Sequence, residues 1–132
     1  MALFSDAELA YLTGERRLGR LATVDATGQP HVVPIGMWRH NAKFGTIDIS
    51  GRNFAATKKF RNVKAAPRAA FVVDDLASID PWRPRSVMVQ GRAEAVEAAD
   101  PAGEGGEAII RITPDSIVSW GLEGSEAATR RT

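Results

Sequence analysis

The sequence predicts a mainly β fold: an antiparallel sheet rolled towards a barrel, accompanied by two short helices. Its 132 residues fit a single domain. About seven segments have the apolar alternation or the β-branched content of strands, and most are joined by short turns. Successive strands begin roughly ten residues apart, a spacing typical of sandwiches and barrels rather than of alternating strand and helix units.

Two segments carry helix signals. The first covers residues 5–13, where Ser5 is a good N-cap and Glu8, three residues later, completes a capping box. The second covers residues 54–64, and Asn53 is predicted to cap it. In the second helix, Ala56, Phe60 and Val63 lie at i, i+4 and i+7 and form one apolar stripe.

The strand signals fill most of the remaining chain. The predicted strands are residues 18–24, 31–38, 44–50, 68–75, 86–96, 108–112 and 116–122. Pro34 cannot donate a ladder hydrogen bond, so it predicts a sheet edge, a bulge or an opening beside a ligand. Gly91 predicts a bulge, and residues 76–85 read as a proline-rich loop. Residues 123–132 lack apolar content and are expected to fray, which leaves 1–122 as the domain.

Composition excludes several classes of protein. The absence of cysteine rules out disulfides, thiolate metal sites and thiol nucleophiles. His31 and His40 are the only histidines and lie at opposite ends of one predicted strand, so no metal site is expected. No apolar run approaches the roughly 20 residues of a membrane span. The acidic start MALFSDAELA does not resemble a secretion signal, and we expect a cytoplasmic protein without a membrane partner.

Charge is unevenly distributed along the chain. The net charge is +1, yet residues 1–92 hold 14 basic and 8 acidic side chains, whereas residues 93–132 hold 3 and 8. The window 49–73 has no acid at all. It contains six bases, namely Arg52, Lys58, Lys59, Arg61, Lys64 and Arg68. Such a window indicates a local anion site rather than a basic surface, so no nucleic acid partner is expected.

The segment SGRNFAATKK (50–59) concentrates this signal. It combines a strand end, a turn of small residues and a helix start, where unpaired N–H groups and the helix dipole favour an anion. The glycine at Gly51 allows close approach of the backbone, and Thr57 offers a hydroxyl. The alternative interpretation is an ordinary solvated face of an amphipathic helix.

Two tryptophans stand in unusual surroundings. Trp82 lies among prolines and arginines in PWRPR, and Trp120 lies near the end of the last strand. Such residues can stack on a flat ring and hold its charges. Ordinary packing against other side chains is an equally good explanation of both tryptophans.

Four segments taken in order carry a family resemblance: RLGRLATVDATGQPHVVPIG, FGTIDISGRNFAATKKFRNVKAAPRAAFVVDD, VMVQGRAEAV and SIVSWGL. They resemble the pyridoxamine 5′-phosphate oxidase-like superfamily. Within it, the chain is similar to small actinobacterial proteins described as F420-dependent oxidoreductases. The resemblance covers roughly residues 4–122 and implies a six-stranded antiparallel split β-barrel. It also implies a homodimer with cofactor sites at the interface.

The resemblance implies which residues form the site. A returning strand would lie along the cofactor ring, a helix start would hold the phosphate, and the start of a later strand would reach the cofactor from the partner chain. The implied cofactor-binding residues are Val32, Val33, Pro34, Ile35, Ser50, Gly51, Arg52, Asn53, Thr57, Lys58, Lys59, Arg85 and Ser86. The implied substrate pocket is formed by Trp82, Arg83 and Trp120. No catalytic residue is assigned.

The sequence differs from the oxidase branch of the superfamily at positions that bear on its function. That branch has an arginine entering the second strand, where this chain has His31, and a C-terminal arginine that SWGLEGS does not match. Oxidation of pyridoxamine phosphate is therefore not expected. We expect an F420-dependent oxidoreductase that transfers a hydride between the reduced deazaflavin and a small unsaturated organic acceptor. The alternatives are an FMN-dependent reductase or oxidase on the same fold, and a non-enzymatic cofactor carrier or anion-binding module.

Overall fold

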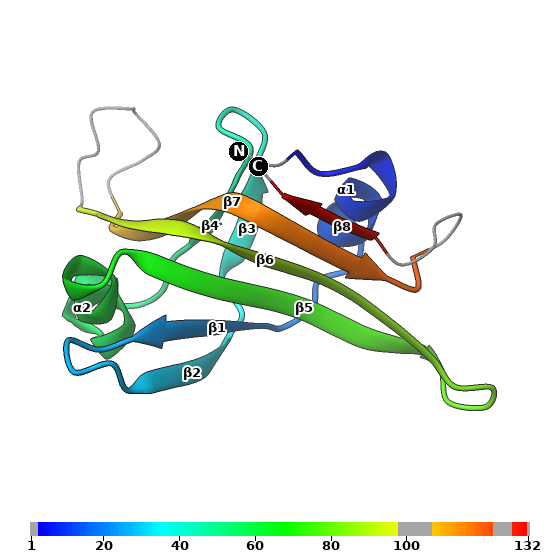
Figure 1. Ribbon diagram of the computed structural model, residues 1–132, viewed down its shortest axis with the longest axis horizontal. Helices are drawn as coiled ribbons and strands as arrows, with labels where there is room; N and C mark the ends of the chain where they lie inside the picture. Colours follow the sequence, from blue (N-terminus) through cyan, green and yellow to red (C-terminus); the bar gives the residue numbers. More distant parts are fainter. Residues whose placement is uncertain (1–2, 98–106, 123–127, 132) are drawn as a thin grey trace.

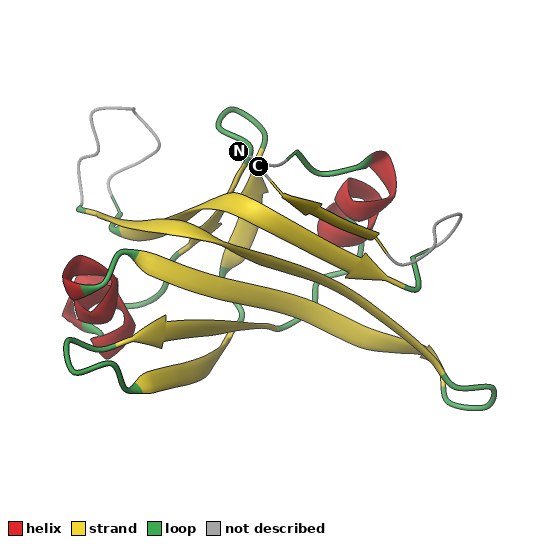
Figure 2. Ribbon diagram, in the orientation of Figure 1, coloured by secondary structure: helices red, strands yellow, loops and turns green. Residues whose placement is uncertain are grey.

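The computed structural model describes residues 3–97, 107–122 and 128–131 of the chain. The strands are β1 (Gly19–Val24), β2 (Pro30–Ile35), β3 (Trp38–Asn41), β4 (Thr46–Ile49), β5 (Arg68–Ser78), β6 (Arg83–Val96), β7 (Ile109–Trp120) and β8 (Ala128–Arg131). The helices are α1 (Asp6–Thr13), the 3₁₀ turn η1 (Phe54–Ala56) and α2 (Lys58–Ala65). Figures 1 and 2 show the two helices at opposite ends of a long sheet.

The described strands form one antiparallel sheet with the order β2-β1-β5-β6-β7-β4-β3, to which β8 is added beside β7. The sheet curls, so that β4, which pairs with β7, passes behind it in the view of Figure 1. The predicted mainly β, antiparallel class with two short helices is confirmed. The strand count differs: the described part of the chain has eight strands where the family resemblance implied six.

The first helix forms as predicted. The Ser5 hydroxyl accepts a hydrogen bond from the Glu8 N–H at 3.2 Å, and the Glu8 carboxylate accepts one from the Ser5 N–H at 2.8 Å. This reciprocal capping box satisfies two backbone donors at the helix start. Tyr11 and Leu12, near the end of the helix, are buried against the sheet.

The second helix starts later than predicted, and Asn53 does not cap it. Asn53 has a left-handed backbone (φ 48°) and precedes the 3₁₀ turn η1. The N-cap of α2 is Thr57, whose hydroxyl accepts a hydrogen bond from the Phe60 N–H. The predicted helix is thus two elements, because the small residues of FAAT close a tight turn before the helix begins.

Several predicted strand boundaries are corrected. The strand 31–38 is broken after Ile35, so His31 and His40 lie on different strands, β2 and β3. The segments 108–112 and 116–122 belong largely to one strand, β7, because its bulge interrupts the alternation without ending the strand. That bulge confirms the prediction at Gly91, where a Cβ atom would lie 2.0 Å from the Thr113 carbonyl oxygen.

Two predicted irregular segments contain strands. In the loop predicted at 76–85, β5 continues to Ser78 and β6 begins at Arg83, so only the tip is a turn. In the tail 123–132, residues 128–131 form β8 and pair with β7 from Ser116↔Arg131 to Ser119↔Ala128. The expectation of fraying therefore does not hold for those four residues, and 123–127 and 132 lie outside the described residues.

The core occupies one face of the curled sheet. Alternate residues of the strands point to this face, where α1 and α2 cover them. The largest fully buried side chains include Phe60, Leu21, Ile47, Ile49, Ile110, Ile112 and Ile117. Burying each such side chain contributes roughly 1.5–3 kcal/mol, which holds the curvature of the sheet. Among the described residues, no helix has the length and apolarity needed to cross a bilayer.

Candidate functional site

The opposite face of the sheet is not buried. On strands β2, β1, β5 and β6, and on β7 apart from Arg111, every residue that points away from the core is half-buried or exposed. The strand register brings these residues into rows across the sheet. We define the bare face by Val32, Pro34, Val72, Ser86, Met88, Val118 and Trp120. This face has enough apolar surface to receive a flat ring or another protein surface.

The bare face gathers four of the predicted site residues. Pro34 lies in a row with Arg20, Val72 and Met88, and Ser86 lies in the next row directly beside Trp120. Val32 and Trp120 are 66% and 56% exposed. Pro34 is on β2, a terminal strand in the order of the sheet, as its missing donor predicted.

Strand alternation turns the other predicted strand residues towards the core. Ile35 is 5% exposed and Val33 packs against the core, so these two support β2 from behind. Arg85 is adjacent to Ser86 and points to the same side as buried Val87. The predicted set is therefore divided between the two faces of the sheet.

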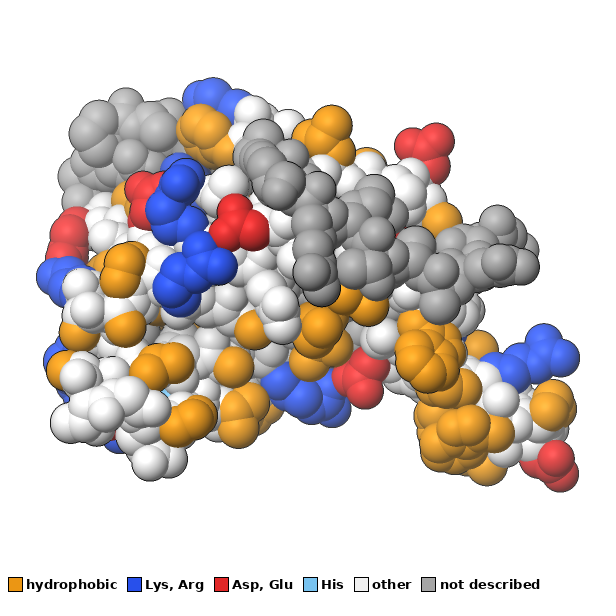
Figure 3. All heavy atoms as spheres, in the orientation of Figure 1, with side chains coloured by type: hydrophobic (Ala, Val, Ile, Leu, Met, Phe, Trp, Pro, Cys, Tyr) orange, Lys and Arg blue, Asp and Glu red, His pale blue; other side chains and the backbone are white. Residues whose placement is uncertain are grey.

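The tip of the β5–β6 hairpin projects beyond the sheet. We call residues 76–84 the arm. Leu76, Ile79 and Trp82 on the arm are 41%, 74% and 66% exposed. Figure 3 shows hydrophobic side chains gathered on this projection. An isolated chain gains nothing from exposing such groups, so the arm has the character of a contact surface.

The start of α2 carries two lysines, and Lys58 lies near the β1–β2 turn. Lys58 lies close enough to Asp25 that its charge contributes to a lowered pKa of that carboxyl. The hydrogen bonds from Thr27 and from the Gln29 N–H contribute more to the same lowering. The Lys59 ammonium lies 5.3 Å from the centre of the Phe54 ring.

The Thr57 hydroxyl, which was predicted to bind a phosphate, has a structural role. The Thr57 Oγ1 donates to the Phe54 carbonyl at 2.7 Å and accepts from the Phe60 N–H at 3.4 Å. Its proton is therefore committed to η1. An anion at this helix start would be held by the lysines and by backbone N–H groups rather than by that hydroxyl.

A cavity of about 540 Å³ lies next to this helix start. It is lined by residues 51–56 together with Glu107 and Ala108. Arg52 contributes a positive charge and Glu107 a negative one, so this cavity has mixed charge. At Gly51 a Cβ atom would lie 3.1 Å from the Phe54 ring, which leaves little room for a larger residue.

The helix start and the arm are far apart within one chain. Lys58 lies near the β1–β2 turn, level with the beginning of β5, whereas Arg85 pairs with Asp75 towards its end. At about 3.3 Å per residue, the seven residues from Arg68 to Asp75 span roughly 23 Å. Figure 1 shows α2 and the arm at opposite ends. A small ligand cannot touch both groups in the same chain.

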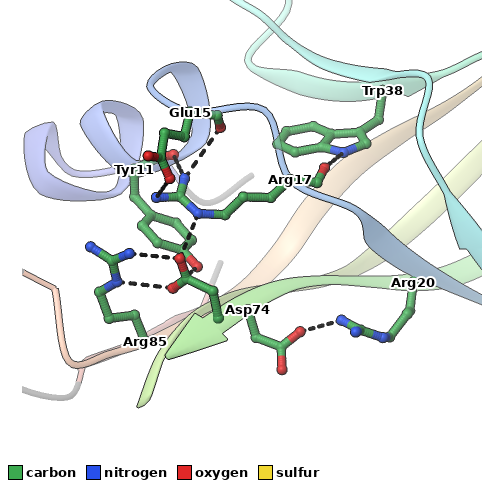
Figure 4. A network of polar contacts seen from close by, with 8 residues as sticks. Tyr11, Glu15, Arg17, Arg20, Trp38, Asp74 and Arg85 are labelled. Atoms are coloured by element: carbon green, nitrogen blue, oxygen red, sulfur yellow. Dashed lines mark hydrogen bonds and ion pairs between the residues drawn. The ribbon is translucent and has the colours of Figure 1, made fainter. Parts of the chain in front are cut away.

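A cluster of charged groups occupies the core side at the end of β5 (Figure 4). Asp75 accepts hydrogen bonds from Arg85 Nε at 2.9 Å and Nη2 at 2.6 Å, from Arg17 Nε at 2.9 Å, and from the Tyr11 hydroxyl at 2.9 Å. The Arg17 guanidinium also stacks 4.0 Å from the centre of the Tyr11 ring. We call Tyr11, Arg17, Asp75 and Arg85 the arginine cluster.

The cluster shifts the ionisation of its members. The hydrogen bonds from Arg85, and after them those from Arg17 and Tyr11, hold the pKa of Asp75 at about 2, below its ordinary 3.8. Burial, followed by the hydrogen bond to Asp75, raises the pKa of Tyr11 above its ordinary value. At neutral pH, Asp75 is thus ionised and Tyr11 is protonated.

Sequence reasoning missed three members of this cluster, Tyr11, Arg17 and Asp75. The signal for Asp75 is strand alternation, since it lies two residues after buried Val73 and so faces the same side. No local pattern places Arg17 beside it, because the contact joins residues 58 positions apart.

A second buried pair is structural. Arg111 donates through two nitrogens to Asp48, both at 3.1 Å, and Asn41 and Thr46 satisfy the remaining carboxylate positions. All four residues are nearly inaccessible. The pair ties β4 to β7 across the curl of the sheet.

The comparisons with known proteins decide the family. A model of the family described as pyridoxamine 5′-phosphate oxidase matches residues 5–121. The chain belongs to this family. A relative from Streptomyces rimosus subsp. rimosus, a 5a,11a-dehydrotetracycline/5a,11a-dehydrooxytetracycline reductase, is 42% identical over 123 residues, which are 92% of this chain and 85% of the relative. The predicted family and its oxidoreductase class are confirmed.

Solved structures share the fold of this family. A protein described as an F420 reductase is 21% identical with a TM-score of 0.60, and the match covers 82% of this chain and 94% of that one. A FAD-binding protein from Mesorhizobium loti is 22% identical with a TM-score of 0.62, covering 88% and 93%. At this identity the likeness concerns the fold.

Proposed function

We propose that this family member is an F420-dependent oxidoreductase that acts as a homodimer and transfers a hydride between the reduced deazaflavin and a small unsaturated organic acceptor. The observation that carries the proposal is the bare face, whose exposed apolar side chains extend from Val32 on β2 to Trp120 on β7, combined with the lysine-bearing start of α2 near the β1–β2 turn. A flat ring with an anionic tail needs this combination. The reductase relative and the F420 reductase of similar fold support the same choice.

The residues present fit such a cofactor. Lys58 and Lys59 provide positive charge at a helix start within an acid-free stretch of sequence, and Gly51 and Arg52 border the adjoining cavity. We propose that these residues, with Ser50 and Asn53 in the same turn, hold the anionic tail. Thr57 contributes by capping α2, which fixes the lysines in place.

The ring would lie along β2. We propose that Val32 and Pro34 contact it from the bare face, while Val33 and Ile35 hold the strand against the core. The bound deazaflavin supplies the hydride, and the protein orients the acceptor and excludes water from it.

Two copies are needed to complete the site. Lys58 and Ser86 are too far apart in one chain, so we propose that Ser86 of the partner subunit reaches the cofactor. The exposed Trp82, Arg83 and Trp120 would then form the substrate pocket beside it. Pairing would also remove the apolar arm and the bare face from water, and each 100 Å² of apolar area buried would stabilise the dimer by about 2.5 kcal/mol.

The experiment is a parallel titration of the purified protein with F420 and with FMN, followed by fluorescence. We expect saturable F420 binding at micromolar concentration and weaker FMN binding. Replacing Lys59 with glutamine should weaken F420 binding about tenfold, the loss of one charge-assisted contact. The matched control is Lys64→Gln, at the exposed far end of α2, where affinity should stay within about twofold. A protein that is purified yellow and prefers FMN would overturn the choice of cofactor.

A further inference from the structure

A second cavity lies on the side of the sheet opposite the bare face, between α1 and the start of β6. It is lined by Ala7, Ala10, Tyr11, Arg17, Arg85 and Leu122. Its volume is about 290 Å³, which equals the volume of roughly ten molecules of liquid water. The function proposed above makes no use of this space.

Among the described residues, the lining of the cavity contains two arginines and no acid, and the carboxylates that pair with these arginines lie outside the lining. Two guanidinium groups, of Arg17 and Arg85, share the single carboxylate of Asp75. The Arg17 side chain is only 12% exposed, so water compensates it poorly. Glu15 lies 3.7 Å from Arg17, but its side chain is 81% exposed and water screens its charge.

One edge of Arg85 is available to a ligand. Its Nε and Nη2 donate to Asp75, and no described residue accepts a hydrogen bond from its Nη1. Figure 4 shows this third nitrogen turned away from Asp75. Arg17 makes more hydrogen bonds: its Nε donates to Asp75, its Nη1 donates to the carbonyl oxygens of Tyr11 at 2.8 Å and Glu15 at 3.3 Å, and its Nη2 lies 3.7 Å from the Glu15 carboxylate. Arg85 is therefore held rigidly while it keeps two N–H donors for another acceptor.

The walls of the cavity are apolar and small. Ala7 and Ala10 are three residues apart on α1, so their methyl groups lie on one side of the helix. Leu122 closes the cavity, and it is positioned by Gly121, whose φ of 69° turns the chain after Trp120. A ligand here would need an apolar body as well as an anionic group.

We infer that this cavity is a binding site for a small organic monoanion, whose carboxylate pairs with Arg85 and whose apolar body lies between α1 and Leu122. The site lies across the sheet from the proposed cofactor site. The inference therefore stands or falls independently of the F420 proposal.

The test uses benzoate as the probe and benzamide as its neutral counterpart of the same shape, titrated into the cofactor-free protein. The amide NMR signals of residues 6–13 report on α1. We expect saturable shifts with benzoate in the millimolar range, and benzamide binding at least about tenfold weaker. Equal binding of the two compounds, or shifts confined to residues away from α1, would overturn the inference.

Three variants locate the binding. Arg85→Gln should weaken benzoate binding about tenfold, since Arg17 continues to hold Asp75. Arg92→Gln is the matched control, because Arg92 is exposed at the other end of the same strand, and it should change affinity less than about twofold. Ala10→Leu fills the cavity without changing charge and should also abolish binding. Unchanged affinity in Arg85→Gln or in Ala10→Leu would refute the assignment.

Discussion

Asp75 links three segments that are distant in the sequence, and its replacement by asparagine is expected to be costly. Its pKa of about 2 against an ordinary 3.8 corresponds to about 2 kcal/mol of stability at neutral pH. The carboxylate is only 26% exposed, so solvent screening reduces this figure little. Asparagine would accept fewer hydrogen bonds and would remove the half-buried counter-charge that Arg17 and Arg85 share. We expect the free energy of unfolding at pH 7 to fall by about 2 kcal/mol, or roughly 8 °C in Tm.

Urea denaturation followed by circular dichroism measures this loss. The matched control is Asp74→Asn, the adjacent residue on the opposite face, whose pair with Arg20 is about half exposed. We expect it to cost less than about 0.5 kcal/mol. Because the folded-state pKa of Asp75 is lowered, its contribution is complete above pH 4 and disappears as the pH falls towards 2. If Asp75→Asn costs no more than Asp74→Asn, or if its cost does not shrink in acid, the assigned role of the cluster is wrong.

Three further predictions concern particular positions. Gly121→Ala should lower the free energy of unfolding by about 2 kcal/mol or more, because φ is 69° and a Cβ atom would lie 2.1 Å from the Pro84 carbonyl oxygen. The control Gly28→Ala has a φ of 91° but open space around the Cβ position, so it should cost about 1 kcal/mol, and equal costs of the two variants in thermal unfolding would contradict the prediction. Thr57→Ala should cost about 1 kcal/mol and Thr57→Ser much less, because only the hydroxyl caps α2; a similar loss in both would argue against capping. Trp82→Glu should shift the sedimentation of the protein from dimer to monomer, because it places a charge on the apolar arm; an unchanged dimer would exclude the arm from the interface.

The sequence was a good guide wherever local chemistry decides structure. The capping box at Ser5 follows from residues close in the sequence, and the bulge at Gly91 follows from the absence of a side chain there; both are confirmed. Strand ends were predicted less well. The bulge in β7 interrupts the alternation of the sequence, and the proline-rich arm has the sequence of a loop, although strand pairing keeps most of both segments extended. Asn53 and Thr57 are both good caps, and only the closure of η1 selects Thr57.

The candidate site was predictable in part. The charge window and Pro34 locate the α2 start and the edge strand from residues that are near one another in sequence. The arginine cluster was not predictable, because Arg17 and Asp75 meet only after the sheet has formed. Sequence spacing also could not show that Arg85 and Ser86 point to opposite faces, since that depends on which face of β6 is buried.

We propose that two copies of the chain together build two equivalent F420 sites, each with residues of the bare face and of the start of α2. Sedimentation velocity in the presence of F420, recorded at the absorbance of the cofactor and at that of the protein, tests this claim directly. The account predicts that the cofactor sediments with a dimer, at one F420 per chain, and that the Trp82→Glu monomer loses it. F420 sedimenting with a monomer at undiminished affinity would contradict the account.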